Sequence, residues 1–600
     1  MPKDNKKKKN LIFRFLVWKY KHISERQFIY LLSIVVGCLA GLGMVLLKNF
    51  THLIQSVVHG NLVSENLETT LYFIFPTVGL FFVYLVIRFV IKKQVDHGIP
   101  STLFSISKQK GIIERYKIYA SILTAPITVG FGGSVGLEGP GISTGAALGS
   151  NIARLFHMNT KTRMLLIGCA SAAAMSSMFK APIAAIIFAM EVFSLDIAVA
   201  SLIPLLLASL SGVITSYFFL GDDVLFNFKL QDKFQISDIG FYIALGLFTG
   251  IASVYFSKIF FGITNFFEGI KNPISRLIYG GLAIGIMLFF IPELYGEGYD
   301  MMNNLLHGRE ISGLGNFSFL DQVSDNIWVI IAMLLVITLF KAIAMTTTFA
   351  AGGVGGIFFP TLFMGSTLGN LIAKIINNIG LGFHVSESNF TLIGMSGLMA
   401  GVLHAPLTAI FLIAEITGGY ELFIPLMLVA AISYAFTKYF ISNSIYTMKL
   451  AQRGELITHN KDQHVILMMD IDEVIETNFI CVSPDMLLGE MLHKAVAKSS
   501  RNNFPVINDD KEFLGVILLD DIRSIMFDEK LYNKVTVSSL MHSAPDIIDY
   551  DEDCMKDIMK KFKETRAWNL PVIKKGKYAG FISKSRLLSA YRQKLIEVSA

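Results

Sequence analysis

The sequence is short of charge and lacks the motifs that mark common soluble enzymes. Only 16% of its 600 residues are Asp, Glu, Lys or Arg, whereas soluble proteins carry about 25%. Neither an HExxH motif nor a glycine loop ending in Lys-Ser/Thr occurs. A GxSxG pattern occurs at 132–136 and 141–145, but inside an apolar helical region rather than at a strand-to-helix turn. We therefore predict that the protein is not an enzyme and holds no metal ion.

Cysteine is scarce as well, with four residues in the chain. None of them forms a CxxC pair; two lie in apolar segments and two in the polar C-terminal part. This distribution favours reduced, structural thiols over a disulfide framework. The four are Cys38, Cys169, Cys481 and Cys554.

What the sequence does contain is a series of long apolar runs. Hydrophobic residues make up 53% of the chain, and its mean hydropathy is +0.55. The run 28–47 carries no charge and is long enough to cross a bilayer, which takes about 20 residues. These runs predict a polytopic all-α membrane protein surrounded by membrane lipid. Comparable runs follow at 71–87, 202–220, 239–256, 277–291, 327–340 and 422–436.

The segment 1–27 is basic and shows no sign of being a cleavable leader. It carries four consecutive lysines, Lys6 to Lys9, and no small-residue cleavage site stands before Phe28. By the positive-inside tendency we expect it to stay cytoplasmic, with the stretch 11–21 lying along the inner membrane surface. Such basic flanks account for the net charge of +6, so we expect no nucleic-acid partner.

One glycine-rich stretch interrupts the apolar part: Gly132-Gly133-Ser134-Val135-Gly136-Leu137-Glu138-Gly139-Pro140. Each glycine inside a helix costs roughly 1 kcal/mol against alanine, so we expect a backbone break here and a helix over 142–155. A helix N-terminus offers unpaired N–H groups and partial positive charge, which together make an anion site. Inside a membrane such a break survives only where it is buried or lines a cavity. A glycine-rich turn with Glu138 as an acidic cap is the alternative.

Part of this stretch recurs in the second half of the apolar region. Gly136-x-x-x-Pro140 is repeated as Gly356-x-x-x-Pro360. Two halves that each contain a broken helix indicate a repeat-built transporter with its site between the halves. We place the halves at 28–225 and 235–455. The second break carries no acid, so its amides are free to bind an anion.

Two more features of the apolar part fit this pattern. Ala181-Pro182 with Glu191 recurs as Ala405-Pro406 with Glu415, and we expect these two equivalent glutamates to pair with helix ends. A third break at 96–101 has glycine before a helix start and proline just inside it. It predicts another N-terminus directed at the same place.

Four segments resemble the anion-site segments of the CLC family of chloride channels and transporters. They are Gly98-Ile99-Pro100, the stretch 136–140, the stretch 356–360 and Tyr446, in the family's order within 28–455. The resemblance implies a homodimer with one anion pathway per subunit, two inverted halves and chloride as the transported ion. It also implies that Glu138 is the gating glutamate. The implied anion-binding residues are His97, Gly98, Ile99, Gly136, Gly139, Gly356, Ile357, Phe358 and Tyr446.

The chain departs from the family's pattern at three positions. His97 replaces a common serine; it either donates an N–H to the anion or turns away and leaves only backbone amides there. Leu137 replaces an arginine or lysine, which weakens anion attraction at the outer approach. Val192 stands where many proton-coupled members have an internal glutamate. Valine cannot relay a proton, which favours a channel, although some exchangers of the family lack this acid.

Lys180, just before Ala181-Pro182, is a lone charge in an apolar stretch. Lysines inside a membrane usually face water or a partner. Lys180 either draws small anions toward an inner vestibule or snorkels to the interface.

The composition changes after Tyr446, where charges return, and a linker is expected at 456–467. Beyond it, Phe504-Pro505-Val506-Ile507 recurs as Leu570-Pro571-Val572-Ile573. The two copies, 468–530 and 535–600, resemble a tandem cystathionine-β-synthase (CBS) pair, an α/β module often attached to CLC proteins. Such pairs often bind an adenine nucleotide, but neither copy carries the full pattern, so a purely structural module is the alternative. The residues that match part of the pattern are Asp521, Ser583 and Arg586.

The sequence thus predicts a CLC-type chloride channel, gated by Glu138 and regulated by a cytoplasmic CBS pair. We expect it to cross the cell membrane several times with both termini in the cytoplasm. A chloride/proton antiporter of the same family is the alternative, separated by whether protons move with anions. A membrane-anchored ligand sensor is a more distant alternative, since a signalling bundle needs neither broken helices nor Glu138.

Overall fold

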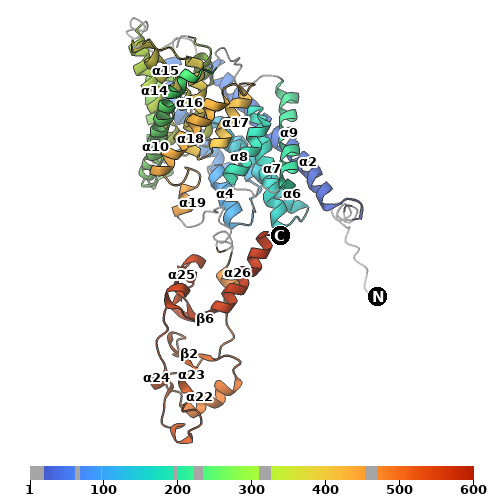
Figure 1. Ribbon diagram of the computed structural model, residues 1–600, viewed down its shortest axis with the longest axis vertical. Helices are drawn as coiled ribbons and strands as arrows, with labels where there is room; N and C mark the ends of the chain where they lie inside the picture. Colours follow the sequence, from blue (N-terminus) through green and yellow to red (C-terminus); the bar gives the residue numbers. More distant parts are fainter. Residues whose placement is uncertain are drawn as a thin grey trace. The chain divides into compact units, whose positions relative to one another are not determined.

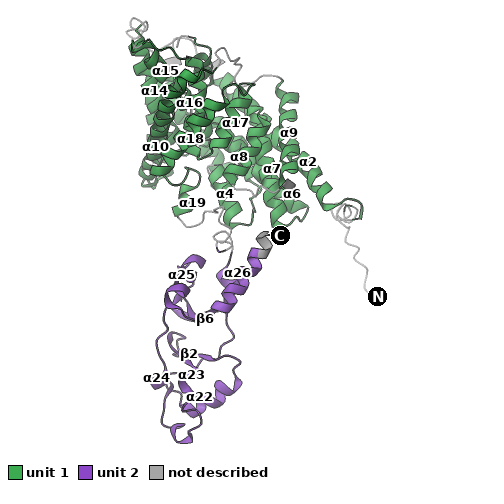
Figure 2. Cartoon of the chain, viewed as in Figure 1, with its two compact units in different colours: residues 1–456 green, residues 457–600 purple. Residues whose placement is uncertain are grey.

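The computed structural model describes residues 19, 21–60, 68–95, 98–193, 199–221, 234–309, 326–380, 382–452, 466 and 469–599. The chain forms two compact units, residues 1–456 and 457–600 (Figure 2). The first unit is helical, and the second combines short strands with helices (Figure 1). The predicted helical membrane part with an α/β tail is therefore confirmed. The stretch 11–21, predicted to lie on the membrane surface, falls almost entirely outside the described residues.

Unit 1 is built from helices of very different length, several of which are interrupted or short. A π-helical segment, Val86–Ile91, prolongs the second of its described helices. The bounds are α2 (Glu25–Gly60), α3 (Glu68–Leu85), α4 (Ile99–Lys108), α5 (Lys117–Gly130), α6 (Glu138–Leu155), α7 (Thr160–Phe179), α8 (Pro182–Phe193), α9 (Val199–Leu220), α10 (Ile239–Glu268), α11 (Pro273–Phe290), α12 (Tyr299–Leu306), α14 (Ile327–Ala350), α15 (Phe358–Asn378), α16 (Glu387–Leu403), α17 (Pro406–Ile416), α18 (Phe423–Phe440) and α19 (Met448–Gln452).

Within the described residues, nine helical segments are long and apolar enough to cross a membrane. Seven of them contain the runs predicted from the sequence, namely α2, α3, α9, α10, α11, α14 and α18. The other two, α7 and α15, were not predicted, because Ala, Ser, Gly, Thr and Asn lower their hydropathy. Both are largely enclosed by other helices, so neighbouring protein rather than lipid contacts them and small or polar residues are tolerated.

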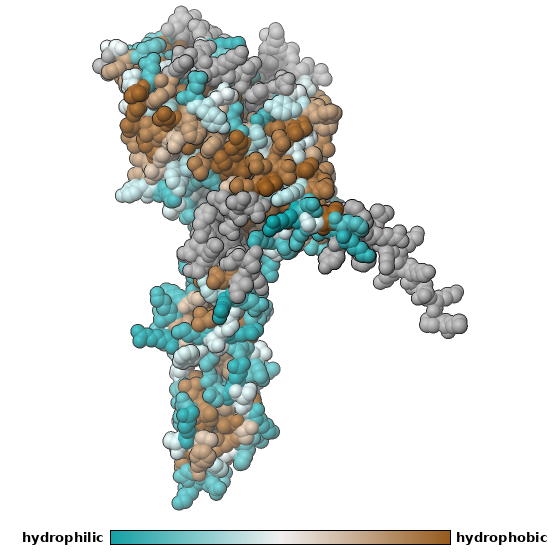
Figure 3. All heavy atoms as spheres, turned by 45° about the vertical axis from the view of Figure 1, so that its right-hand side comes forward, coloured by the Kyte–Doolittle hydropathy of each residue, from teal (hydrophilic) through white to brown (hydrophobic). Residues whose placement is uncertain are grey.

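The surface of unit 1 carries broad apolar areas (Figure 3). Large apolar side chains that are more than half exposed include Leu31, Phe89, Leu206, Phe218 and Phe266. Apolar area of this extent marks a membrane-facing or binding surface rather than one bathed in water. In the same view, unit 2 is mostly hydrophilic.

The two halves of unit 1 pack their helices in the same way. Helix α6 packs on α7 as α15 packs on α16, and α2 packs on α9 as α10 packs on α18. Glycines four residues apart bring the backbones together: a Cβ at Gly145 would lie 2.6 Å from the Ala170 oxygen, and one at Gly365 2.5 Å from the Gly394 oxygen. Small residues at this spacing allow membrane helices to approach closely. They fix the helix pairs that begin at the two predicted breaks.

Unit 2 contains a four-stranded sheet, a two-stranded sheet and short helices. The larger sheet has the strand order β1-β6-β5-β4, and β2 pairs with β3 as a hairpin. The strands are β1 (Ile475–Glu476), β2 (Asn503–Ile507), β3 (Phe513–Leu518), β4 (Ile548–Asp549), β5 (Asn569–Lys574) and β6 (Lys577–Ser583). The α-helices are α21 (Ile471–Val474), α22 (Leu488–Lys494), α23 (Leu519–Ile522), α24 (Val537–Leu540), α25 (Met555–Thr565) and α26 (Lys584–Ser599).

The opening segment of each copy crosses to the other copy. Strand β1 of the first copy pairs antiparallel with β6 of the second, while His542 of the second copy exchanges two backbone hydrogen bonds with Val516 in β3 of the first. The apolar cores follow the same exchange: Val474 lies in the core of the second copy, and Val537 in that of the first. Neither copy therefore has a complete core without the other.

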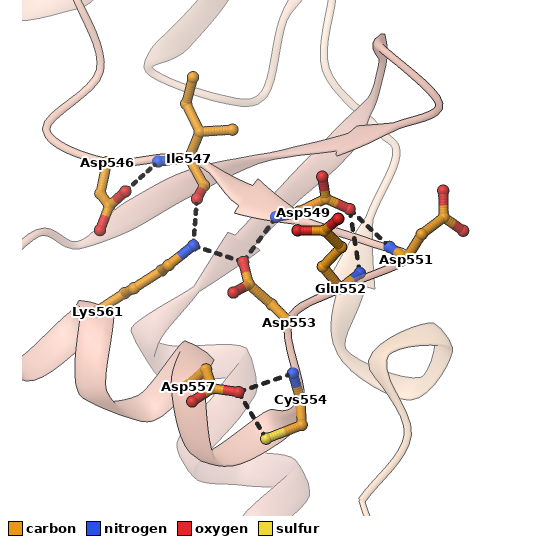
Figure 4. Close-up of polar contacts among 9 residues, drawn as sticks. All are labelled: Asp546, Ile547, Asp549, Asp551, Glu552, Asp553, Cys554, Asp557 and Lys561. Atoms are coloured by element: carbon orange, nitrogen blue, oxygen red, sulfur yellow. Dashed lines mark hydrogen bonds and ion pairs between the residues drawn. The ribbon is translucent and has the colours of Figure 1, made fainter. Parts of the chain in front are cut away.

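The connection from β4 to α25 is acidic and is held by its own polar contacts (Figure 4). Asp553 accepts the N–H of Asp549 at 2.7 Å and pairs with Lys561 at 2.5 Å. At the start of α25, Cys554 donates both its thiol and its N–H to Asp557, and the thiol hydrogen bond is the main cause that lowers the pKa of Asp557. All four cysteines are free thiols, as the sequence predicted.

Candidate functional site

The two glycine-rich breaks meet in a short backbone bridge. The Gly136 N–H donates to the Gly356 oxygen at 3.0 Å, and the Gly356 N–H donates to the Gly136 oxygen at 2.6 Å. Helix α6 begins at Glu138 and helix α15 at Phe358, directly after these glycines. Backbone hydrogen bonds therefore hold together two helix N-termini, one from each half.

Helix α6 starts at Glu138, four residues before the predicted helix 142–155. That prediction was wrong about Gly139, Pro140 and Gly141, which form the first turn. Proline suits this turn because the N–H it lacks would have no intrahelical acceptor, and the Gly141 N–H already donates to the Leu137 oxygen. Glu138 is thus a helical residue rather than part of the loop before the helix.

The Glu138 side chain crosses from α6 to the N-terminus of α15. The residue is 1% exposed, and its Oε1 accepts the Phe359 N–H at 3.0 Å. Because Pro360 has no N–H, the first turn of α15 offers only the donors of Phe358 and Phe359. The other oxygen, Oε2, has no hydrogen-bond partner among the described residues. The carboxylate therefore lies at a helix N-terminus, the kind of place where a free anion binds.

Glycine at both bridge positions leaves room for this carboxylate. A Cβ on Gly136 or on Gly356 would collide with the oxygens of Glu138. An alanine at either place would push the carboxylate off the N-terminus of α15. The recurrence of glycine at these two positions thus has a steric reason in addition to the backbone break.

The start of α4 lies against the same point. Gly98 has φ +51°, and a Cβ on it would lie 2.8 Å from the Gly139 oxygen; a Cβ on Gly139 would lie 3.0 Å from the Gly356 Cα. Ile99, the first residue of α4, is buried. The starts of α4, α6 and α15 therefore converge. His97 lies outside the described residues.

Tyr446 adds a hydroxyl to this region. The residue is 3% exposed, its hydroxyl has no hydrogen-bond partner in the described part of the chain, and it lies within electrostatic reach of Glu138. Ile357 and Phe358 are also buried, and the Phe358 ring packs against Phe179 with centroids 5.2 Å apart. The surroundings thus combine apolar walls with a few neutral donors, which suits a weakly held, mobile anion.

Two further carboxylates, predicted to pair with helix ends, do so reciprocally. Glu191 of α8 accepts two N–H groups in the first turn of α17, at 2.9 and 3.2 Å. Glu415 of α17 accepts two N–H groups in the first turn of α8, at 2.7 and 3.0 Å. Each carboxylate therefore caps the helix that carries the other. The neighbouring Val192 is 9% exposed and brings no titratable group.

Lys180 ends α7 in a left-handed conformation with φ 54°. Its Nζ donates to the Gly221 oxygen at 2.7 Å and lies 4.6 Å from the centroid of the Tyr217 ring. His404 ends α16, the equivalent helix of the second half, in the same conformation with φ 55°. The lysine ammonium is thus held at the end of α9, which favours the snorkelling alternative.

Sequence analysis missed a buried carboxylate in the linker between α11 and α12. Glu297 is 9% exposed, and its Oε1 accepts the Leu137 N–H at 3.0 Å. Lys341 of α14 is fully buried and donates to the Gly296 oxygen at 2.9 Å. Two signals were available in the sequence. Glu297 stands between two glycines after the apolar run 277–291, and Lys341 is a lone charge at the end of the apolar run 327–340. Phe359, whose N–H donates to Glu138, was missed as well.

In unit 2, the residues suggested for a nucleotide already serve helix starts. Asp521 accepts the Leu518 N–H at 2.8 Å, and Ser583 accepts the Arg586 N–H at 3.1 Å. The Ser583 hydroxyl also donates to the Glu476 carboxylate. These contacts favour the structural interpretation of Asp521 and Ser583. The Arg586 guanidinium donates to the Glu473 oxygen at 3.4 Å.

Helix N-termini from two related halves, meeting on a buried carboxylate inside an apolar helical unit, define a membrane transport protein built from broken helices. The chain belongs to the CLC family, whose family model, described as voltage gated chloride channel, matches residues 78–438. The CBS domain model matches 471–528 and 537–593. The predicted resemblance to CLC proteins with a CBS pair is confirmed.

Individual proteins agree with this assignment. The putative chloride channel protein ClcB-like of Ralstonia nicotianae is 27% identical over 385 residues, which cover 63% of this chain and 85% of the relative. Chloride channel protein CLC-e of Arabidopsis thaliana is 23% identical over 556 residues, covering 82% of this chain and 75% of the relative. The crystal structure of a slow cyanobacterial Cl−/H+ antiporter matches with a TM-score of 0.61 at 18% identity, covering 72% of this chain and 98% of that chain. This structural match shows the fold alone.

Proposed function

We propose that this protein is a chloride channel whose pathway is closed by the Glu138 carboxylate. One observation carries the proposal: the carboxylate is buried on the Phe359 N–H, with one oxygen lacking a hydrogen-bond partner among the described residues. Membership of the CLC family and the chloride-channel names of its relatives support chloride as the ion. The anion-binding groups are the amides of Ile357 and Phe358, the Tyr446 hydroxyl and the backbone at Gly98, Ile99, Gly136, Gly139 and Gly356.

In this proposal the anion and the carboxylate compete for the N-terminus of α15, where Glu138 accepts the Phe359 N–H. An ionised Glu138 is attracted to the positive end of α15 and keeps an anion out. A protonated Glu138 is neutral, loses that attraction and leaves the N–H groups to chloride. Flux therefore rises as the pH falls through the protonation of Glu138. The donors carry no full charge, so the bound chloride remains free to leave.

The absence of an acid at position 192 supports passive conduction. A coupled exchanger has to deliver a proton to the gate from the other side of the membrane, and Val192 cannot carry one. Leu137 places no cation beside the gate. We infer that chloride entry is less strongly steered here than in relatives with arginine or lysine at that position.

A chloride/proton antiporter is the second candidate. It is favoured by the fold match to a protein described as a slow Cl−/H+ antiporter. In that case Glu138 would carry the proton as well as close the pathway.

Proton movement in liposomes that contain the purified protein separates the two candidates. Under an outward chloride gradient, a channel gives anion efflux without proton movement. An antiporter gives uphill proton uptake that disappears in Glu138→Gln. If neither chloride nor another small anion moves, the proposed transport function is wrong and the sensor alternative regains weight.

We further propose a homodimer in the cell membrane, with one pathway per subunit and both termini in the cytoplasm. The apolar surface of unit 1 supports a membrane location, and the basic segment 1–27 supports the orientation. Mass measurement of the detergent-solubilised protein tests the assembly. Protease access to either terminus in sealed, right-side-out vesicles would contradict the orientation.

The CBS pair is proposed to regulate the channel as one body, because each copy contributes to the core of the other. An adenine nucleotide that uses Asp521 or Ser583 would have to compete with their present capping contacts. One that uses the Arg586 guanidinium would have to compete with the Glu473 oxygen. Thermal unfolding of the full-length protein with and without ATP or AMP tests this: a ligand at 100 times its Kd adds about 2.7 kcal/mol. An unchanged melting temperature would leave the pair a purely structural module.

A further inference from the structure

The backbone residue next to the gate is held by a carboxylate from the other half of the unit. Glu297 lies between α11 and α12, and its Oε1 accepts the N–H of Leu137 at 3.0 Å. Leu137 directly precedes Glu138 and forms the N-cap of α6. The Leu137 side chain makes no capping hydrogen bond to α6. The Leu137 N–H is satisfied by the Glu297 carboxylate.

The linker that carries Glu297 is itself anchored at several points. Buried Lys341 donates to the carbonyl oxygens of Leu294 and Gly296, at 3.3 and 2.9 Å. The Ser134 hydroxyl donates to the same Leu294 oxygen at 2.6 Å. The linker therefore lies against the glycine-rich stretch just before Glu138, and these contacts hold the backbone that leads into Glu297.

Glu138 and Glu297 each accept a backbone N–H at the start of a helix from the other half. Glu138, from the first half, accepts an N–H at the start of α15. Glu297, from the second half, accepts an N–H at the start of α6. The charged and titratable groups that act on Glu297 are Glu138, Lys48, Lys341 and Tyr299. Buried Lys341 and half-buried Lys48 thus lie where they can offset two buried carboxylates, as burial of charge requires.

We propose that Glu297 is a positioning residue of the gate: it anchors the backbone at Leu137, and its charge sets the pH at which Glu138 takes up a proton. The inference rests on the proposed gating role of Glu138. With Leu137 anchored, the gate opens by rotation of one side chain while the start of α6 stays in place. When both are ionised the two carboxylates repel each other, so the pair takes up its first proton at a higher pH than either group would alone.

The test is the pH dependence of chloride efflux from liposomes for wild type and Glu297→Gln. Glutamine keeps an acceptor for the Leu137 N–H but removes the charge. The half-maximal pH of efflux should then fall by about one unit, because Glu138 loses the repulsion that favoured protonation. Glu293→Gln is the matched control. Glu293 lies in the same linker, but the acceptor of the Leu137 N–H is Glu297. The pH profile of Glu293→Gln should therefore match that of wild type.

A double variant shows whether Glu297 acts through the gate. In a Glu138→Gln background no ionisable gate remains, so adding Glu297→Gln should produce no further change in pH dependence. Glu297→Asp keeps the charge but shortens the reach to Leu137. It should lower the maximal efflux while leaving the half-maximal pH unchanged, which also gives a result if Glu297→Gln does not assemble.

An unshifted profile in well-folded, monodisperse Glu297→Gln overturns the inference. So does a shift of equal size in the Glu138→Gln background, or in Glu297→Asp. These results differ from failure of the proposed function, in which wild type itself gives no chloride efflux or efflux without any pH dependence.

Discussion

Two kinds of carboxylate cross between the halves of unit 1, and they differ in symmetry. Glu191 and Glu415 occupy equivalent positions in the two repeats, and each caps the helix that carries the other. Glu138 has no such counterpart, because the residue that begins α15 in the second half is Phe358. Both kinds place a carboxylate on the first-turn N–H groups of a helix from the other half, and Glu138 is buried whereas Glu191 and Glu415 are half-buried.

Under the proposed function, the symmetric pair is structural and Glu138 is the functional acid. Where both repeats supply the acid, all acceptors and donors are matched, and the contact holds the halves together. Where only one repeat supplies it, a carboxylate oxygen and the Tyr446 hydroxyl remain without hydrogen-bond partners in the described part of the chain. Under the proposed function, a bound anion completes the hydrogen bonding of the Tyr446 hydroxyl.

Removing the charge of Glu138 should have the largest effect on chloride efflux, because this carboxylate is present at the start of α6 and absent from the start of α15. Glu138→Gln should conduct chloride independently of pH. Two pH units above the wild-type midpoint, only about 1% of wild-type gates are protonated, so the variant should exceed wild type there by up to about 100-fold. Chloride efflux from liposomes measures this. Glu114→Gln, which breaks an exposed ion pair with Lys93, is the control; a Glu138→Gln profile that follows wild type would contradict the gate.

Truncating the symmetric acids should reduce stability and leave the gate intact. Glu191→Ala and Glu415→Ala each leave two N–H groups without their charged acceptor, at a cost of about 2–4 kcal/mol in the free energy of unfolding. Thermal unfolding in detergent measures the loss, and the pH profile of chloride efflux should persist. Glu268→Ala, which removes an exposed ion pair with Lys449, should change stability by less than about 1 kcal/mol. A large loss for one acid and none for its counterpart would break the proposed equivalence.

Removing the unpaired hydroxyl should weaken binding without weakening the fold. Tyr446→Phe loses a donor to the anion worth about 1 kcal/mol, which corresponds to roughly fivefold weaker chloride binding by calorimetry. Stability should hardly change, because no hydrogen bond in the described structure is lost. Tyr255→Phe is the matched control: its hydroxyl donates to the Leu339 oxygen at 3.0 Å, so stability should fall while affinity stays the same. The opposite pattern would show that Tyr446 is structural.

The smallest expected effect concerns the two CBS copies of unit 2, whose helix-capping residues differ. Asp521 accepts the N–H of the residue before its helix, whereas Ser583 accepts the N–H of the third residue within its helix. The two copies thus each keep one half of a capping box. Asp521→Ala and Ser583→Ala should each lower the free energy of unfolding of the tail by about 1 kcal/mol, measured by thermal unfolding. A much larger effect of one substitution on ATP binding than on stability would instead reveal a ligand site.

The outline of the fold and the main residue of the site could be predicted from the sequence, because repeats and glycine spacing are local patterns. Gly136 and Gly356 stand out in an apolar context. The first break carries an acid, Glu138, and the second carries none. Helices α7 and α15 were missed because their enclosure by other helices permits small and polar residues. The start of α6 was placed too late because glycine lowers helix propensity even where the first turn tolerates it.

Glu297 shows what sequence reasoning could not reach. It is part of none of the repeated motifs, lies in a linker and accepts the N–H of Leu137, which is 160 positions away in the sequence. The exchange of strands between the two copies of the tail is of the same kind, since β1 spans only two residues. Such contacts depend on tertiary packing, which single-sequence patterns do not record.

The bridge between Gly136 and Gly356 restricts how the protein can move. Many transporters carry their substrate by rocking one half against the other about a central site. Here such a rotation would pull apart two buried backbone hydrogen bonds, at about 1–3 kcal/mol for each group left unsatisfied, and would also strip the caps from α8 and α17. The bridge therefore favours halves that stay in place, and under the proposed function the Glu138 side chain alone opens and closes the pathway.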